Sequence, residues 1–275
     1  MPQFNDTELT AAVIRSFEET PDPRAKFLLE ELVKSLHDYV RKTDLSFDEW
    51  GTAIEFLTRT GQKCTPIRQE FILLSDVLGV SMLVDAVNHR EREGATETTV
   101  LGPFYVGEHK VMPHGTDVSA NLPGERMFVQ SRVTDLQGKP LANVPVDIWH
   151  ADDEGYYSGF APHLPEGNLR GVVTTDDEGR FEIRTIQPAP YQIPTDGPTG
   201  KLITAAGWHP WRPAHLHLIV RAPGHRPITT QLYFSGGEWL DSDVAEAVKP
   251  ELVLDPQDQG DGTRKSTYDF ELERA

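Results

Sequence analysis

Two histidines separated by one residue are the first side chains in this sequence with an obvious chemical use. They are His215 and His217, in the segment RPAHLHLIV (residues 212–220). If this segment is a β-strand, residues i and i+2 point to the same face, so both imidazoles can bind one metal ion. Leu216 and Leu218 then pack on the opposite face. The motif alone is weak evidence, because two histidines on a solvated strand face give the same pattern.

Tyrosines in two loop-like segments could complete such a metal site. Tyr156 and Tyr157 are adjacent in DIWHADDEGYYSGF, and Tyr191 lies in APYQIPTDGPTG. Phenolate is a hard, anionic oxygen donor of the kind that ferric iron favours. The spacing leaves two other sets open, which are Fe(II) held by two histidines and a carboxylate, and zinc with an open position. The candidate carboxylates are Asp152, Asp153 and Asp196.

The first hundred residues carry the signals of helices. Apolar side chains recur there at three- and four-residue spacing. Four helix starts are predicted, at Asn5 with Glu8, Asp22 before Pro23, Ser46 with Glu49, and Thr65 before Pro66. The apolar faces of these helices should pack together or against a partner subunit.

The pattern changes to strands after residue 100. Alternating apolar residues predict strands near residues 127–133, 144–148, 172–175, 181–184, 216–220, 231–234 and 268–272. The turn at 176–179 predicts a hairpin between the third and the fourth of these strands. The fold class is therefore α+β, with a helical dimerisation or linker region at residues 1–100 and an antiparallel β-sandwich at residues 101–275.

Composition and charge exclude several classes of function. The chain has 275 residues, 38% hydrophobic and 25% charged, which is typical of an ordinary folded protein. Its net charge of −17 disfavours binding to nucleic acid or to anionic lipid surfaces. Cys64 is the one cysteine, so an internal disulfide and a cysteine-based metal cluster are both excluded. The start, MPQFNDTELT, does not read as a secretory signal, and we expect a cytoplasmic protein.

Five longer motifs follow one another along the chain, namely LGPFYV, WHADDEGYYS, GRFEIRTIQPAPY, RPAHLHLIV and TTQLYF. With the helical N-terminal part, they resemble the intradiol ring-cleavage dioxygenases over nearly the whole chain. Several long motifs in register are far more specific than one His-x-His. The resemblance implies a catalytic β-sandwich that opens a catechol-type ring between its two adjacent hydroxyls.

The resemblance also implies one Fe(III) per chain, held by two tyrosines and two histidines. The matching positions are Tyr157 (the tyrosine directly before the serine in GYYS), Tyr191 in APY, His215 and His217. Tyr191 would be the ligand that the substrate displaces and would act as a base toward it.

Two further positions match functional residues of the family. Arg212, three residues before the first histidine, would stabilise negative charge that develops on the ring. Gln231, in TTQ, would lie near the side where oxygen binds.

The helical segment at residues 70–89, with GATETTVLGPF, resembles most the branch of the family that acts on hydroxyquinol (benzene-1,2,4-triol). The positions matching its pocket are Leu73, Asp76, Val100, Leu101, Gly102, Pro103, Ile193 and Pro194, and Phe104 is a candidate for stacking near the ring. Asp76 could accept a hydrogen bond from the third hydroxyl, which catechol lacks. Leu101 stands where relatives often have a bulkier aromatic residue, which leaves room for a substituted ring.

We therefore predict that hydroxyquinol and O₂ give 3-hydroxy-cis,cis-muconate, which tautomerises to maleylacetate, with catechols as the alternative substrates. A non-catalytic sandwich is a remote alternative, because LQGKPLANVPVDIW also resembles transthyretin-like modules. The helical region predicts a homodimer, and the resemblance implies an amphipathic lipid enclosed at its interface.

Overall fold

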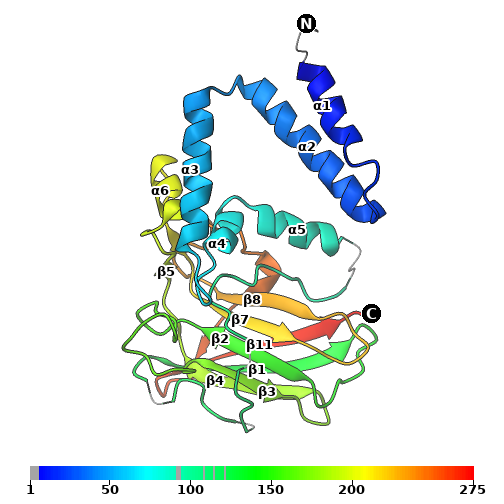
Figure 1. The fold of residues 1–275 in the computed structure, drawn as a ribbon. Coiled ribbons are helices and arrows are strands. Elements are labelled where there is room, and N and C mark those ends of the chain that lie inside the picture. The colour runs from blue at the N-terminus through cyan, green and yellow to red at the C-terminus, as the bar shows by residue number, and fades with distance from the viewer. Residues whose placement is uncertain (1–5, 91–93, 108, 114, 121) are drawn as a thin grey trace, which may run out of the picture. The chain divides into compact units, whose positions relative to one another are not determined.

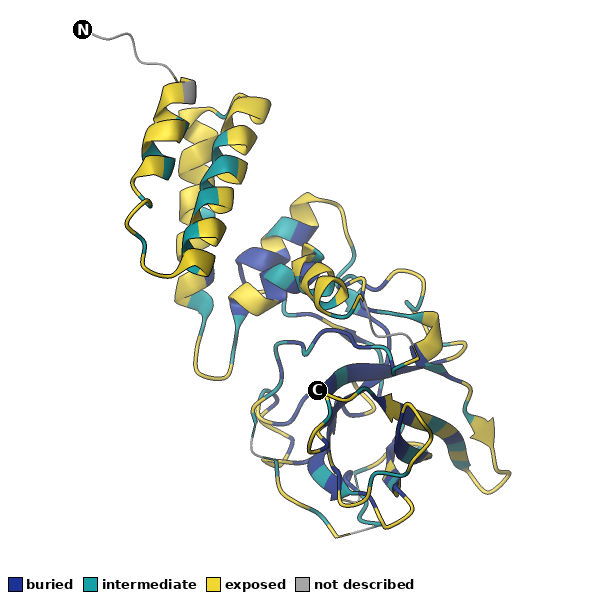
Figure 2. Ribbon diagram, turned by 90° about the vertical axis from the view of Figure 1, so that its right-hand side faces the viewer, coloured by how far each residue is buried: buried dark blue, intermediate teal, exposed yellow. Residues whose placement is uncertain are grey.

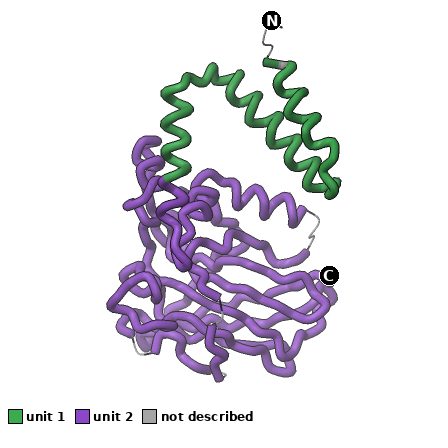
Figure 3. Tube along the Cα trace, viewed as in Figure 1, with its two compact units in different colours: residues 1–58 green, residues 59–275 purple. Residues whose placement is uncertain are grey.

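The structure is a computed structural model that describes residues 6–90, 94–107, 109–113, 115–120 and 122–275. The chain divides into two compact units, residues 1–58 and residues 59–275 (Figure 3). The boundary falls inside α3 (Phe47–Lys63), so the helices that follow α3 belong to the same unit as the sheets.

The first unit contains α1 (Asp6–Arg15), α2 (Pro23–Thr43) and most of α3. Two of the predicted helix starts are confirmed in it. The side chain of Asp22 accepts hydrogen bonds from two backbone N–H groups of the first turn of α2. Ser46 and Glu49 form the expected reciprocal capping box before α3. The predicted start at Asn5 lies outside the described residues.

The second unit begins with the end of α3 and two shorter helices, α4 (Glu70–Val77) and α5 (Val80–Asn88). The predicted start at Thr65 and Pro66 is wrong, because the Thr65 hydroxyl accepts the N–H of Arg68 in a separate turn and the helix begins at Glu70. Gly79, at φ 69°, separates α4 from α5.

Two larger sheets and a short ribbon follow (Figure 1). The four-stranded sheet has the order β10 (Gln257–Asp258), β11 (Thr263–Leu272), β1 (Arg126–Asp135), β4 (Arg180–Ile186). The five-stranded sheet has the order β3 (Arg170–Thr174), β2 (Pro145–His150), β7 (His215–Val220), β8 (Ile228–Phe234), β9 (Val253–Leu254). The ribbon pairs β5 (Tyr191–Gln192) with β6 (Trp211–Arg212), and the remaining helices are α6 (Pro198–Ala205) and the 3₁₀-helix η1 (Pro250–Leu252).

The prediction of an α+β fold is confirmed, but the prediction of a purely antiparallel sandwich is wrong. β1 pairs with β11 in parallel, and β8 pairs with β9 in parallel. Side chains alternate in the same way in both kinds of pairing, so the apolar pattern predicts the strands without their directions. The predicted hairpin is also wrong, because β3 pairs with β2 whereas β4 pairs with β1 in the other sheet.

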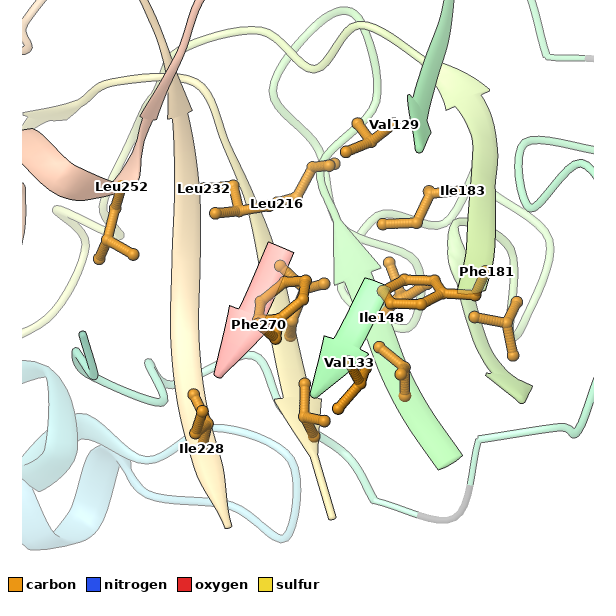
Figure 4. Close-up of a cluster of buried hydrophobic side chains, with 14 of the residues drawn as sticks. Val129, Val133, Ile148, Phe181, Ile183, Leu216, Ile228, Leu232, Leu252 and Phe270 are labelled. Carbon is orange, nitrogen blue, oxygen red and sulfur yellow. The ribbon is translucent and has the colours of Figure 1, made fainter. Parts of the chain in front are cut away.

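The hydrophobic core lies between the two larger sheets (Figure 4). Val129, Ile183 and Phe270 of the four-stranded sheet meet Ile148 and Leu216 of the five-stranded sheet, and all five side chains are fully buried. Figure 2 shows the strands of the sandwich mostly buried and α1–α3 mostly exposed. Among the described residues, no helix is long and apolar enough to cross a membrane.

Candidate active site

The face of the five-stranded sheet that points away from the core carries the polar residues of the site. Trp149 on β2, His217 on β7 and Gln231 on β8 are cross-strand partners and therefore form one row. His215 and Tyr233 form the neighbouring row. All five side chains are buried. The fold thus places both histidines on one strand face, as predicted. A second layer of structure covers that face and buries them.

Three donor atoms converge above this face. Nε2 of His215 and Nε2 of His217 lie 3.0 Å apart, and the hydroxyl oxygen of Tyr157 lies 3.2 Å from Nε2 of His217 and 3.5 Å from Nε2 of His215. Atoms bound to one ion at about 2.1 Å, with bonds at right angles, are about 3 Å apart. The three atoms therefore have the spacing of ligands to a single metal ion.

The imidazole of His215 directs the lone pair of its Nε2 atom toward His217. Nδ1 of His215 donates to the carbonyl of Pro213 at 2.7 Å, which leaves the lone pair on Nε2. Burial lowers the pKa of His215 to about 3 and lowers the pKa of His217 well below its usual value. Nδ1 of His217 has no hydrogen-bond partner in the described part of the chain, and its ring stacks on Trp149 at a centroid distance of 4.6 Å. Two buried, neutral imidazoles whose Nε2 atoms lie 3.0 Å apart favour a bound cation.

Tyr191, on the β5–β6 ribbon, lies beside Tyr157 and His215. Its ring lies 5.3 Å from that of Tyr157 and 5.6 Å from that of His215, measured between centroids. Arg212 is its direct cross-strand partner. Burial raises the pKa of Tyr157 and of Tyr191, and the charge of Arg212 opposes both rises. Each phenol therefore ionises only beside a strong positive charge, and a metal ion supplies such a charge.

Arg212 is held by three side chains. Its Nε and Nη2 donate to the two carboxylate oxygens of Asp243 at 2.9 and 2.8 Å. Nη2 also donates to Oε1 of Gln231 at 2.9 Å and contacts the hydroxyl of Tyr233 at 3.3 Å. The amide nitrogen of Gln231 donates to the carbonyl of Val100 at 2.8 Å. Arg212 and Gln231 are thus part of one buried network beside the histidines.

An apolar wall adjoins the donor atoms. One cluster of packed side chains contains five of the predicted site residues, namely Leu73, Phe104, Tyr157, Tyr191 and Ile193, with Leu101 packed against it. The ring of Phe104 stacks on that of Tyr157 at 4.5 Å and meets that of Tyr191 edge-on at 5.8 Å.

A cavity of about 180 Å³ opens beside this wall. Leu73, Pro103, Phe104 and Pro194 are among the residues that line it. Gly102 lies close to the donor atoms, because a Cβ atom placed on it would lie 3.1 Å from Cε1 of His217. Val100 sits in a separate small apolar cluster with Ala245 and Ala247, and reaches the site through its carbonyl bond to Gln231.

Asp76 on α4 is a buried carboxylate with an unused acceptor. Its Oδ1 has no hydrogen-bond partner within the described residues. Burial raises the pKa of Asp76 to about 6, with a further rise from Asp243, while Ser81 and Arg212 oppose the rise. Buried carboxylates usually have their hydrogen bonds satisfied, so a free oxygen is an acceptor available to a ligand.

Two of the three alternative carboxylate ligands, Asp152 and Asp196, are engaged elsewhere. Oδ1 of Asp152 accepts two backbone N–H groups of its own loop, and Asp196 forms ion pairs with Lys63 and Arg68. Within the described residues, no group of three His, Cys, Asp or Glu side chains could hold a metal ion. The exposed Tyr156 contacts His163, whereas the adjacent Tyr157 lies beside the two histidines. The geometry therefore favours the donor set that contains tyrosine.

Two family models together match most of the chain. The model described as "Dioxygenase" matches residues 100–274, and the model described as "Catechol dioxygenase N terminus" matches residues 22–96. The chain belongs to the intradiol ring-cleavage dioxygenase family. The resemblance seen in the motifs is thereby confirmed, over nearly the full length of the chain.

Relatives within this dioxygenase family are similar over almost their entire length. A 6-chlorohydroxyquinol 1,2-dioxygenase of Cupriavidus pinatubonensis is 44% identical, with 99% of this chain and 99% of the relative covered. A hydroxyquinol 1,2-dioxygenase of a Rhizobium species is 42% identical over 97% of this chain and 91% of the relative. The solved hydroxyquinol 1,2-dioxygenase of Pseudomonas putida superimposes with a TM-score of 0.88 at 43% identity, covering 98% of this chain and 99% of that one.

Sequence reasoning missed three residues of this dioxygenase's site. Trp149 stacks on the ring of His217. It was missed because a tryptophan in a strand is ordinarily expected to pack in the core. Arg170 donates to both the hydroxyl and the carbonyl of Ser158, and its guanidinium lies 6.0 Å from the centre of the Tyr157 ring. Asp243 pairs with Arg212 from a loop 31 residues away. One signal could have indicated an acidic partner for Arg212, because a buried arginine needs a counter-charge.

Proposed function

We propose that this dioxygenase uses one Fe(III) per chain to open hydroxyquinol between its adjacent hydroxyls, with both atoms of O₂ entering the product. The product is 3-hydroxy-cis,cis-muconate, the tautomer of maleylacetate. The substrate assignment rests on the buried carboxylate oxygen of Asp76 that has no hydrogen-bond partner among the described residues. The convergence of Tyr157, His215 and His217 supports the assignment of the metal.

Tyr157, Tyr191, His215 and His217 would hold the iron. Two phenolates and two neutral imidazoles suit a hard ferric ion, and their two negative charges offset part of its charge. Bound iron would bind the two adjacent hydroxyl oxygens of the substrate and activate the ring toward O₂. The apolar wall around Phe104 would hold the ring against the donor atoms and exclude bulk water.

Tyr191 would accept a proton from a substrate hydroxyl. Its ring lies beside that of His215, and burial raises its pKa, so a phenolate there is a strong base. Arg212 would place its positive charge beside the ring as negative charge develops there. Gln231 would hold Arg212 and the Val100 segment together through its two hydrogen bonds.

Asp76 would select the triol. A carboxylate with a free oxygen can accept a hydrogen bond from the third hydroxyl, whereas catechol leaves that oxygen unsatisfied. Leu101 is smaller than the aromatic residues that relatives often have there, and the relative from Cupriavidus is named for a chlorinated hydroxyquinol. We therefore include 6-chlorohydroxyquinol as a substrate, with catechols as the weaker alternative.

The helices of the first unit would form a homodimer. Phe27, Leu32, Tyr39 and Trp50 each expose half or more of their surface on α2 and α3, and Phe47 exposes 89%. Apolar helix faces of this kind favour burial against a second copy of the chain, with an amphipathic lipid between the copies. Light scattering at micromolar concentration should give a dimer, and lipid extraction with mass spectrometry tests the lipid separately.

Two measurements on the purified protein test the metal. We expect about one iron per chain and a visible tyrosinate-to-iron charge-transfer band that shifts when hydroxyquinol is added without O₂. Stoichiometric zinc with no visible band would refute the ferric proposal. Absence of any bound metal, with no O₂ uptake after iron is supplied, would favour a non-catalytic sandwich.

Specificity constants test the substrate. The wild-type protein should prefer hydroxyquinol to catechol, and Asp76→Asn or Asp76→Leu should lower this preference by roughly 10- to 100-fold. Asp85→Asn is the matched control, because it alters another mostly buried acidic side chain, on α5, that pairs with Lys249. A higher specificity constant for catechol in the wild type, or an unchanged ratio in Asp76→Leu, would refute the assignment of hydroxyquinol as the preferred substrate. The proposal that the protein opens the ring would not be affected.

A further inference from the structure

Asp243 is a buried carboxylate to which the chemistry above gives no task. The geometry points to Asp243 as the positioning residue of Arg212, which fixes the guanidinium so that Nη1 is directed toward His215 and the substrate. This inference rests on the proposed function, because it assigns Arg212 the role of stabilising charge on the ring.

All four contacts of the Asp243 carboxylate are within the protein. Oδ1 accepts from Nε of Arg212 at 2.9 Å and from the N–H of Ala245 at 3.1 Å. Oδ2 accepts from Nη2 of Arg212 at 2.8 Å and from the N–H of Ala247 at 3.3 Å. With both oxygens occupied, the carboxylate has little capacity left to bind a substrate or accept its proton. Its effect on the reaction must therefore pass through Arg212.

The donors of Arg212 are unevenly used. The single N–H of Nε goes to Asp243, and the two N–H groups of Nη2 have Asp243 and Gln231 as their nearest acceptors. Nη1 lies 3.4 Å from Nε2 of His215, and Arg212 also bonds to the hydroxyl of Tyr191. Nε and Nη2 bind the two oxygens of Asp243 as a fork. Because the guanidinium is planar, this fork fixes the direction of Nη1 as well. That direction is toward the donor atoms of the metal site.

The same carboxylate ties Arg212 to the small apolar cluster of Val100, Ala245 and Ala247. Its two backbone contacts hold the turn that carries Ala245 and Ala247, and these alanines pack against Val100. The hydroxyl of Thr99 donates to the carbonyl of Ala247 at 3.0 Å, and Gln231 joins Val100 to Arg212. Asp243 thus closes a ring of hydrogen bonds and contacts around the guanidinium.

Charge gives a second reason for an aspartate at this position. Arg212 is 3% exposed, and a buried cation of this kind needs a counter-charge. Asp243 forms the ion pair, whereas Asp76 makes no hydrogen bond to Arg212 and influences it only through space. Without Asp243, the guanidinium would lose its counter-charge and the two hydrogen bonds that fix its direction.

Three single variants of the iron-loaded protein test the inference. Asp243→Asn should lower kcat for hydroxyquinol by about 100-fold, because small displacements of a positioned charge have effects of that size. The Kd for hydroxyquinol, measured without O₂ from the visible band, should change by less than about threefold, since Arg212 acts on charge that develops later. Asp243→Glu keeps the charge and should lose less than Asp243→Asn.

Asp135→Asn is the matched control. Asp135 is also buried and also accepts two backbone N–H groups, from Gln137 and Lys139, in the turn after β1. It should lose thermal stability while kcat per iron stays within about twofold of the wild type. Equal losses of kcat per iron in Asp243→Asn and Asp135→Asn would overturn the inference.

A double-mutant cycle separates positioning from a general structural effect. In an Arg212→Lys background the fork is already lost, so adding Asp243→Asn should lower kcat by less than about threefold further. The same 100-fold factor in both backgrounds would overturn the inference. If Asp243→Asn does not fold or retain iron, Asp243→Glu takes its place in the cycle with the same criterion. A wild-type protein that does not turn over hydroxyquinol overturns the proposed function and this inference together, whereas failure of the cycle in an active protein overturns only this inference.

Discussion

Tyr191 and Arg212 are direct cross-strand partners in the two-stranded β5–β6 ribbon. A short ribbon therefore delivers a base and a cation to the same side of the histidines, and the charge of Arg212 lowers the pKa of Tyr191 against the stronger effect of burial. The two residues are linked by backbone pairing, so their relative position does not depend on flexible loops.

Replacing Tyr191 with Phe removes the proposed metal ligand and proton acceptor while the ring remains. We expect kcat to fall by roughly 10²- to 10⁴-fold for hydroxyquinol and for catechol alike, the range typical of a lost general base. Steady-state O₂ uptake measures both rates. Tyr156→Phe, at the exposed neighbour of Tyr157, is the control and should behave as the wild type. A Tyr191→Phe protein that selectively lost one substrate would show that Tyr191 acts in recognition instead.

The preference for hydroxyquinol should depend on pH through Asp76. Burial raises its pKa to about 6, so the carboxylate proposed to accept a hydrogen bond from the third hydroxyl is present above that pH and is protonated below it. The ratio of specificity constants for hydroxyquinol over catechol should therefore fall as the pH is lowered through about 6. In Asp76→Asn the step near pH 6 should be absent. Any pH dependence that comes from ionisation of the substrates remains in this variant, so it also serves as the control. A ratio with the same pH profile in both proteins would contradict the prediction.

Gly102 should be required for metal binding. It has φ of 77°, and a Cβ atom would lie 3.1 Å from the His217 ring. Gly102→Ala should lose about 1–2 kcal/mol from backbone strain and should also displace His217, which lowers the iron bound per chain. Gly138→Ala has nearly the same φ, 75°, with nothing near the added methyl group, so it should lose stability but keep its iron. Equal iron contents in the two variants would refute the role of this close approach.

Arg170 should tune the colour of the iron-loaded protein. Its guanidinium lies 6.0 Å from the centre of the Tyr157 ring and stabilises the phenolate. In Arg170→Met the phenolate electrons lose that stabilisation, so the charge-transfer band should move to longer wavelength. Arg184→Met is the control, because Arg184 lies at a similar distance, 5.8 Å, from the ring of Phe128 on the other sheet. A shift to shorter wavelength, or equal shifts in both variants, would contradict this account.

Local features of the fold were predictable from the sequence. The caps at Asp22 and at Ser46 with Glu49 depend on hydrogen bonds from a side chain to backbone N–H groups two or three residues away, and both form as predicted. His215 and His217 share a strand face because the side-chain period of a strand is two, whatever the strand pairs with.

Features that depend on distant partners were not predictable in the same way. The parallel pairing of β1 with β11 joins strands more than a hundred residues apart, and the separation of β3 and β4 into different sheets reverses what the intervening turn indicates. Asp243 stands among other small and acidic residues in DSDVAEAV, and only the folded chain shows that Arg212 is its partner.

Turnover of hydroxyquinol under ¹⁸O₂, followed by mass spectrometry of the product, tests the central claim most directly. We expect a ring-opened 3-hydroxy-cis,cis-muconate or maleylacetate that carries two labelled oxygen atoms, with cleavage between the adjacent hydroxyls. An unlabelled product, a hydroxylated but unopened ring, or a semialdehyde from cleavage beside the hydroxyl pair would each contradict the account.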